Sequence, residues 1–303
     1  MGAVALRLVA AALLLPTLAF GHVVQRAGVE SGAEPWLLAL LAISAVGYVI
    51  GVVRLWRQAG PARGITRFQA AAFGAGWLTL AGALVGPLDA LGAHLFSAHM
   101  VQHELLMIVA APLLVLGHPL AAWTWALAPA QRRAVGQATR WRWLAGLWSR
   151  ITQPVAAWAL HALALWAWHL PRLFDAALHH EGVHVLQHAS FLATALLFWW
   201  SVLGGDPRSS RGGFALVSLF TTMLHTGALG ALLTFATSPW YDAYAMAGAV
   251  YGLSPVEDQQ LGGLVMWVPG GTAYLIAGLV IVARLLARPA VSPASATRPV
   301  PTR

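Results

Sequence analysis

Seven long apolar segments constrain the fold of this chain more than any other feature. They cover residues 36–56, 68–86, 99–117, 154–169, 183–203, 214–236 and 262–286. A helix needs about 20 apolar residues to cross the hydrocarbon layer of a membrane. The fourth segment is the shortest, and we expect its helix to extend into its flanks. Pro112 is expected to kink the third helix. The pattern predicts an all-α polytopic membrane protein with seven transmembrane helices.

The composition agrees with a membrane protein and excludes several functions. Only 9% of the residues are charged, whereas a soluble domain carries about 25%. All 18 basic residues are arginines, so no lysine can form the Schiff base of a retinal protein. Cysteine is absent, which excludes disulfides, thiolate metal sites and c-type haem attachment. The net charge of +8 is spread over loops, so nucleic acid is not an expected partner.

Arginines are distributed unevenly between the loops. Fifteen lie on one side of the predicted membrane, and only Arg26 and Arg172 lie on the other. Because cytoplasmic loops are enriched in basic residues, we predict an N-terminus outside and a C-terminus in the cytoplasm, in a bacterial plasma membrane. The Arg- and Trp-rich run 140–150 predicts a short helix on membrane lipid, with its tryptophans inward and its arginines on anionic headgroups. A docking surface for a protein partner is the alternative.

The termini predict segments outside the membrane domain. Residues 1–21 resemble a secretory signal peptide, with Arg7, an apolar run and small residues at Ala19 and Gly21. Cleavage after Gly21 would make His22 the N-terminus, and an uncleaved helix broken at Pro16 is the alternative. Residues 22–288 then form one membrane domain. Residues 289–303 are rich in Pro, Ser, Ala and Thr and predict a disordered cytoplasmic tail.

Histidines gather on the predicted outer side of the membrane. Nine of the twelve lie in outer loops or at outer helix ends: His22, His94, His99, His103, His169, His179, His180, His184 and His188. His161 and His225 fall near mid-membrane, and His118 lies at the inner edge. This bias indicates a function for the outer set.

Two histidine pairs have the spacing of metal ligands on helices. His99, His103 and Met107 recur every four residues, so they share one face of a helix. His184 and His188 form a second such pair. Neutral imidazole suits copper, zinc, iron and nickel, and a thioether shifts the preference toward Cu(I), so we predict a copper site. Ring nitrogens of His103 and His188 less than about 5 Å apart would allow a shared metal.

Three further side chains are candidates on the same side. His169 ends the fourth segment, Asp258 precedes the seventh, and Met266 lies roughly 12 Å deeper than Asp258. Asp258 is interpreted as a hard ligand, an acceptor for a ligand imidazole, or an interfacial carboxylate. Met266 is a ligand or ordinary packing. In one alternative, His161 and His225 are axial ligands of haem b in an electron-transfer protein. In another, a copper transport route runs from the outer histidines through His161, His225 and Met266.

Several motifs run through the membrane part of the chain. They are Ser97-Ala98-His99-Met100-Val101-Gln102-His103, Ala111-Pro112-Leu113-Leu114, Trp168-His169-Leu170-Pro171, Leu186-Gln187-His188, Leu197-Phe198-Trp199 and the run from Asp258-Gln259-Gln260 to Val268-Pro269-Gly270-Gly271. In these motifs, over residues 68–286, the chain resembles the CtaG family of polytopic cytochrome c oxidase assembly proteins.

The resemblance implies a non-enzymatic role in maturing the oxidase, by handling copper at the outer membrane face. A terminal oxidase subunit or a copper chaperone would be the partner. By motif, the resemblance selects His99, His103, His169, His188 and Asp258, whereas His184, Met107 and Met266 are candidates by spacing alone. No nucleophile–base arrangement emerges from the sequence, so catalysis is not predicted.

Overall fold

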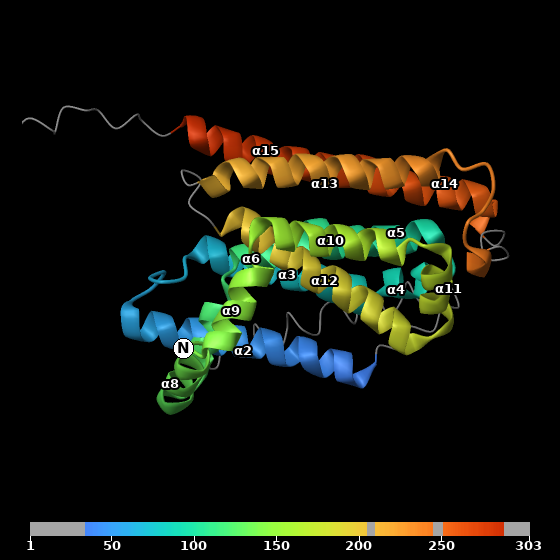
Figure 1. Cartoon of the computed structure of the whole chain (residues 1–303). Helices are drawn as coiled ribbons and strands as arrows, with labels where there is room; N and C mark the ends of the chain where they lie inside the picture. The colour runs from blue at the N-terminus through green and yellow to red at the C-terminus, as the bar shows by residue number, and fades with distance from the viewer. Residues whose placement is uncertain (1–33, 205–209, 245–250, 288–303) are drawn as a thin grey trace, which may run out of the picture.

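The computed structural model describes residues 34–204, 210–244 and 251–287, and every element within them is helical (Figure 1). Single long helices are α2 (Pro35–Ala59), α3 (Arg67–Val85), α10 (Pro154–Trp168), α12 (Glu181–Leu203) and α13 (Ser210–Thr234). Two composite helices are α5 (Phe96–Glu104) with η1 (Leu105–Ala110) and α6 (Ala111–Leu116), and α14 (Pro255–Val265) with η4 (Met266–Gly270) and α15 (Gly271–Leu286). Short helices are α4 (Pro87–Gly92), α7 (Pro119–Ala126), α8 (Pro129–Ala138), α9 (Arg142–Ile151), α11 (Pro171–His179) and η2 (Asp242–Tyr244). The predicted all-α class is confirmed.

Six helices in the described part of the chain are long and apolar enough to cross a membrane. The remaining apolar helix, α10, has 15 residues, about 22 Å at 1.5 Å per residue. The expectation that it extends into its flanks is wrong, because Pro154 begins it and Pro171 already begins α11. The chain is therefore a multi-pass membrane protein, while a seventh crossing and the orientation stay predictions. The predicted signal peptide and C-terminal tail lie outside the described residues.

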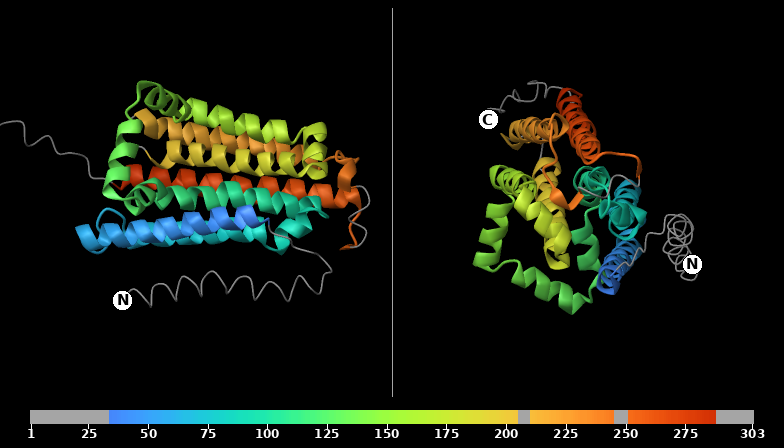
Figure 2. Two further views of the ribbon diagram at one scale, coloured as in Figure 1. Left: turned by 90° about the horizontal axis from the view of Figure 1, so that it is seen from below. Right: turned by 90° about the vertical axis from the view of Figure 1, so that its right-hand side faces the viewer.

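The long helices run side by side in a bundle (Figures 1 and 2). Helix α5 packs on α14, α12 packs on α10 and α6, and α13 packs on α14 and α15. We call the end around His99 and His184, where α5, α12 and α14 begin, the histidine end. We call the opposite end around Arg142 and Arg150, where α8 and α9 lie, the arginine end. The view along the bundle in Figure 2 shows α8 and α9 wrapping around the edge of the arginine end.

Prolines account for two irregular points in the composite helices. The π-helical η1 lies directly before Pro112 in the first turn of α6, and η4 contains Pro269. Proline lacks an N–H and clashes with the carbonyl four residues earlier, and a π turn shifts the hydrogen-bond register past it. The irregularity expected at Pro112 is therefore a π-helical segment.

An aromatic cluster fixes the helices at the histidine end. Phe96, Phe174 and Tyr241 are buried together, with ring centroids of Phe96 and Tyr241 4.9 Å apart and those of Phe174 and Tyr241 4.2 Å apart. Gly262 of α14 lies so close to Phe96 that a Cβ would stand 2.4 Å from the ring. This packing fixes α5 against α14 and α11 through contacts within the chain alone.

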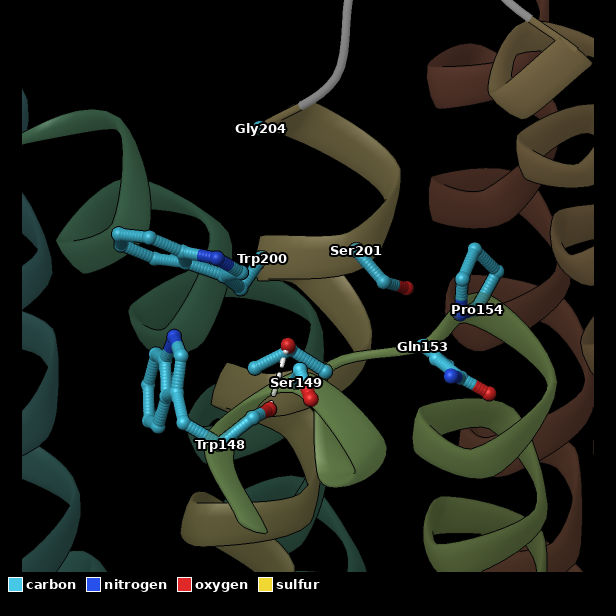
Figure 3. A pocket seen from close by; sticks show the side chains of 8 residues that line it. Trp148, Ser149, Gln153, Pro154, Trp200, Ser201 and Gly204 are labelled. Atoms are coloured by element: carbon cyan, nitrogen blue, oxygen red, sulfur yellow. Dashed lines mark hydrogen bonds between the residues drawn. The ribbon is translucent and has the colours of Figure 1, made fainter. Parts of the chain in front are cut away.

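The arginine end exposes large aromatic side chains and contains a cavity. Trp141, Trp143 and Trp148 are exposed there, on the short helix that the Arg- and Trp-rich run predicts. A cavity of about 340 Å³ lies between the α9–α10 junction and the end of α12 (Figure 3). Trp148 and Trp200 line it with ring centroids 6.0 Å apart. The contact of this end with lipid headgroups stays a prediction.

Candidate metal centre

Asp258 positions the helix that carries the first histidine pair. Its two carboxylate oxygens accept the backbone N–H groups of Phe96 (2.7 Å) and Ser97 (3.0 Å) at the start of α5. The first N–H groups of a helix have no partner within the helix, and a carboxylate there also stabilises the helix dipole. Both oxygens are thus used in capping α5, and Asp258 belongs to neither group of ligand atoms described below.

The two histidine pairs converge at the histidine end. Ring centroids of His103 and His188 lie 5.1 Å apart, and those of His99 and His188 lie 5.6 Å apart. One ring nitrogen from each of His99, His103 and His188 lies within 4.8 Å of the others. We call these three residues the buried triad. With metal–nitrogen bonds of about 2 Å, this separation meets the condition for a shared metal with only small side-chain adjustment.

The buried triad is almost completely buried, and several of its nitrogens lack a hydrogen-bond partner among the described residues. His99 and His103 are each 1% exposed, and His188 is 8% exposed. Nε2 of His99 and both ring nitrogens of His103 are buried without a hydrogen-bond partner among the described residues. Each such atom costs about 1–3 kcal/mol relative to a paired one. A neutral imidazole with a free lone pair is a metal ligand, so these nitrogens fit a metal better than they fit a packed core.

Asp89 is a candidate ligand that the sequence interpretation missed. Its carboxylate and ring nitrogens of His184 and His188 also lie within 4.8 Å of one another, and we call this group the rim triad. Nε2 of His184 lies 3.1 Å from Nε2 of His188. One signal was available in the sequence: Asp89 and Glu104 are the only carboxylates between residues 35 and 174.

The sequence interpretation also did not single out Glu104. It follows His103 at the end of α5 and is buried. Its Oε2 has no partner in the described residues, and a Cβ added at Gly270 would stand 3.0 Å from that oxygen. Glycine at this position of η4 therefore leaves room for the carboxyl group between α5 and η4.

His169 lies one aromatic layer away from the buried triad. Its ring centroid is 6.2 Å from that of Phe191, which is itself 4.6 Å from the ring centroid of His103. Nδ1 of His169 lies 2.7 Å from the carbonyl of Leu165, while Nε2 is buried without a partner in the described parts of the chain. The structure thus places His169 near the buried triad but outside it.

Tyr241 holds the backbone at His169. Its hydroxyl donates to the carbonyl of His169 at 3.1 Å. Burial raises the pKa of Tyr241, and the nearby carboxylate of Asp175 raises it further. The phenol therefore stays protonated over the whole physiological range and keeps donating this hydrogen bond.

The two candidate methionines are buried in apolar clusters. Met107 packs with Leu165 and Phe191, and its carbonyl accepts the indole N–H of Trp199 at 2.8 Å. Met266 packs with Phe96 and Met100. Both methionines are almost completely buried in these clusters, and a role of either sulfur as a metal ligand stays a prediction.

The other histidines lie apart from this centre. His94, His179 and His180 are exposed at the histidine end, and His22 lies outside the described residues. His161 and His225 lie in the middle of α10 and α13, where the His161 ring stacks on Phe198 at 5.3 Å and His225 contacts Trp158 at 6.0 Å between centroids. His118 lies at the α6–α7 junction with a left-handed backbone (φ 51°).

Comparisons with known proteins agree with the motifs. A family model described as cytochrome c oxidase caa3 assembly factor (Caa3_CtaG) matches residues 46–288, which confirms the predicted resemblance. An uncharacterized protein of Mycobacterium bovis is 31% identical over 242 residues, 74% of this chain and 34% of the relative. One of Mycobacterium leprae is 28% identical over 232 residues, 73% of this chain and 34% of the relative. The chain thus spans about a third of the length of these relatives. No solved structure matches the chain.

Proposed function

Because this chain belongs to the cytochrome c oxidase caa3 assembly factor family, we propose that it binds copper at the histidine end and assists its delivery to the oxidase. The observation that carries this proposal is the buried triad: three imidazoles from two helices, with nitrogens of His99 and His103 left unpaired by the described residues. Bound metal would offset the cost of burying these atoms.

Copper is the metal that suits these ligands best. The buried triad offers nitrogen donors in a buried site, and affinity for such ligands is highest for copper among the divalent first-row metals. Neutral imidazoles compensate none of the charge of the metal, and this favours Cu(I), which brings only one positive charge into a low-dielectric site. A terminal oxidase that contains copper is a fitting recipient.

The direction of delivery follows from the distribution of arginines. The arginine end would face the cytoplasm, because cytoplasmic loops carry the excess of basic residues. The histidine end would then face the outer side of a bacterial plasma membrane. There it would meet a copper chaperone or a nascent oxidase subunit. The role needs ligand exchange alone, so we propose no catalytic activity.

Copper binding is tested with the purified full-length protein, loaded with Cu(I) under reducing conditions and passed over a desalting column. The wild type should retain about one copper per chain, since the buried triad is one site. The variant His99→Ala/His103→Ala should lose it. The matched control is His94→Ala/His179→Ala, which removes two exposed histidines from the same end of the bundle. Equal retention by all three proteins would contradict the proposal.

A haem b protein is the second candidate, since His161 and His225 lie on α10 and α13, which pack together. Nε2 of His161 and both ring nitrogens of His225 have no partner within the described ranges. Axial ligation of haem would use such nitrogens. A Soret band in the spectrum of the purified membrane protein supports this candidate, and its absence removes it.

Copper transport, the third alternative, predicts that cell copper changes with expression level in cells that lack the oxidase.

A further inference from the structure

The rim triad adds a second cluster of ligand atoms to the buried triad, which is proposed to bind copper for delivery. It shares His188 with the buried triad and replaces two imidazoles by the Asp89 carboxylate and His184. The two clusters therefore differ in ligand chemistry. One is entirely nitrogen, and the other combines nitrogen with a negatively charged oxygen.

Exposure decreases from the rim triad to the buried triad. Asp89 and His184 are half-buried, whereas His99 and His103 are almost completely buried. The ring of His99 also contacts Phe174 (5.2 Å), and that of His103 contacts Phe191, which is fully buried. A cation from the surface meets Asp89 and His184 first.

Asp89 is held in place by a residue of the histidine helix. Gln102, fully buried on α5 between His99 and His103, donates from Nε2 to Asp89 Oδ1 (2.8 Å) and to the carbonyl of Ala83 (2.8 Å). This bond fixes the carboxylate relative to both triads. The short helix of Asp89 is also fixed at its end, because the hydroxyl of Tyr244 donates to the carbonyl of Gly92 at 2.6 Å.

We propose that the rim triad is a loading site and that copper passes from it to the buried triad with His188 as the ligand kept throughout. In this transfer the bonds from the metal to Asp89 oxygen and His184 nitrogen break. Bonds to the nitrogens of His99 and His103 form. The oxidation state of the metal does not change, and no proton is released, because the incoming imidazoles are neutral and already carry a free lone pair.

The ligand types give this transfer its direction. The Asp89 carboxylate attracts a cation and raises its local concentration at the rim. Carboxylate oxygen is a hard ligand that suits Cu(I) less well than imidazole nitrogen does. Cu(I) that has lost its water at the rim triad is therefore bound more tightly when it moves to the imidazoles of the buried triad. The inference rests on the proposed copper function and adds its route of entry.

The first test measures the rate at which the full-length protein takes Cu(I) from its bicinchoninate complex. The variant Asp89→Asn keeps the shape of the side chain and an oxygen for Gln102. It should load about tenfold more slowly or worse, as expected when a steering charge and a ligand are lost together, and should reach the same final copper content. His184→Gln, which leaves α4 untouched, should slow loading similarly.

The matched control is Glu181→Gln, which removes a charge from an exposed residue one turn before His184 and outside both triads. Its rate of Cu(I) loading should lie within about twofold of the wild-type rate, because exposed charges are screened by salt. Loading of Asp89→Asn at the wild-type rate would overturn the proposal. Equal slowing by Asp89→Asn and Glu181→Gln would overturn it too, because the effect would then be one of charge alone.

A second test separates this inference from the proposed function. In His99→Ala/His103→Ala the rim triad is intact, so this variant should still take up copper, with an affinity too weak for retention on a column. Adding Asp89→Asn should abolish this weak binding. No weak binding in the double variant would overturn the rim triad while leaving the buried triad standing. A wild type that binds no copper would overturn both.

Discussion

The two ends of the bundle arrange their polar side chains in opposite ways. At the histidine end, the buried side chains of Asp258 and Gln102 bond to residues far away in the sequence, as Asp258 does with Phe96. At the arginine end, the hydroxyl groups of Ser149 and Thr152 bond to carbonyls three or four residues earlier, as Ser149 does with Gly146 (2.8 Å). The first arrangement fixes a precise cluster of ligand atoms. The second leaves side chains free to meet a surface outside the chain.

The largest effect on stability is expected from Asp258→Ala. The change removes two hydrogen bonds to a buried carboxylate and leaves the start of α5 without its cap, so we expect a loss of about 3 kcal/mol in the free energy of unfolding. Unfolding by SDS titration in mixed micelles measures it. Glu257→Ala is the control: it removes an exposed carboxylate that accepts the nearby backbone N–H of Ser254, and should cost less stability than Asp258→Ala does. Equal stability of the two variants would show that the histidine end does not depend on this long-range contact.

Gly262→Ala tests the packing that holds α14 against α5. The new Cβ would meet the ring of Phe96 at 2.4 Å, and overpacking of this kind costs about 2 kcal/mol. The same variant should retain less copper, because α5 carries two ligands of the buried triad. Gly278→Ala is the matched control, since no atom of the described residues lies within 4 Å of its added Cβ. A Gly262→Ala protein with the stability of this control would contradict the account.

Local pattern predicted the helices and both histidine pairs, because hydropathy and four-residue spacing are properties of a single segment. That α5 faces α12 could be inferred only from the shared membrane depth of their histidine pairs. The contacts that produce it, such as Asp258 with Phe96, join residues far apart in the sequence. No periodicity reveals such contacts.

The rim triad was missed for a related reason. Asp89 lies in a helix of six residues, too short to show an apolar period, and its relation to His184 exists only in three dimensions. The rarity of carboxylates in this chain was the one available signal. Met107 illustrates the same limit: its spacing from His99 and His103 predicts a shared helix face, but the sequence does not show that Met107 packs in an apolar cluster with Phe191.

A smaller effect is expected at the arginine end from Trp148→Ala. The side chain is half-exposed and contacts Trp200 beside the cavity, so its loss should cost about 1.5 kcal/mol in unfolding free energy. Copper retention should not change, because the variant lies at the opposite end from both triads. A loss of copper in this variant would mean that the two ends are coupled.

The smallest effect is expected from Arg150→Gln. Each arginine at an anionic membrane surface contributes about 1 kcal/mol of attraction. The variant should therefore bind phosphatidylglycerol more weakly than the wild type does, with binding of phosphatidylcholine unchanged, as native mass spectrometry of the protein with each lipid can measure. Arg172→Gln at the histidine end is the control. Equal loss in both variants would contradict the difference between the two ends.

The central claim is that buried imidazoles, and not the neighbouring methionines, hold the metal. X-ray absorption spectroscopy of the Cu(I)-loaded full-length protein tests it most directly. The account predicts two or three imidazole nitrogens at about 2 Å from copper and no sulfur neighbour. A sulfur neighbour at about 2.3 Å, lost in Met107→Leu or Met266→Leu, would contradict it.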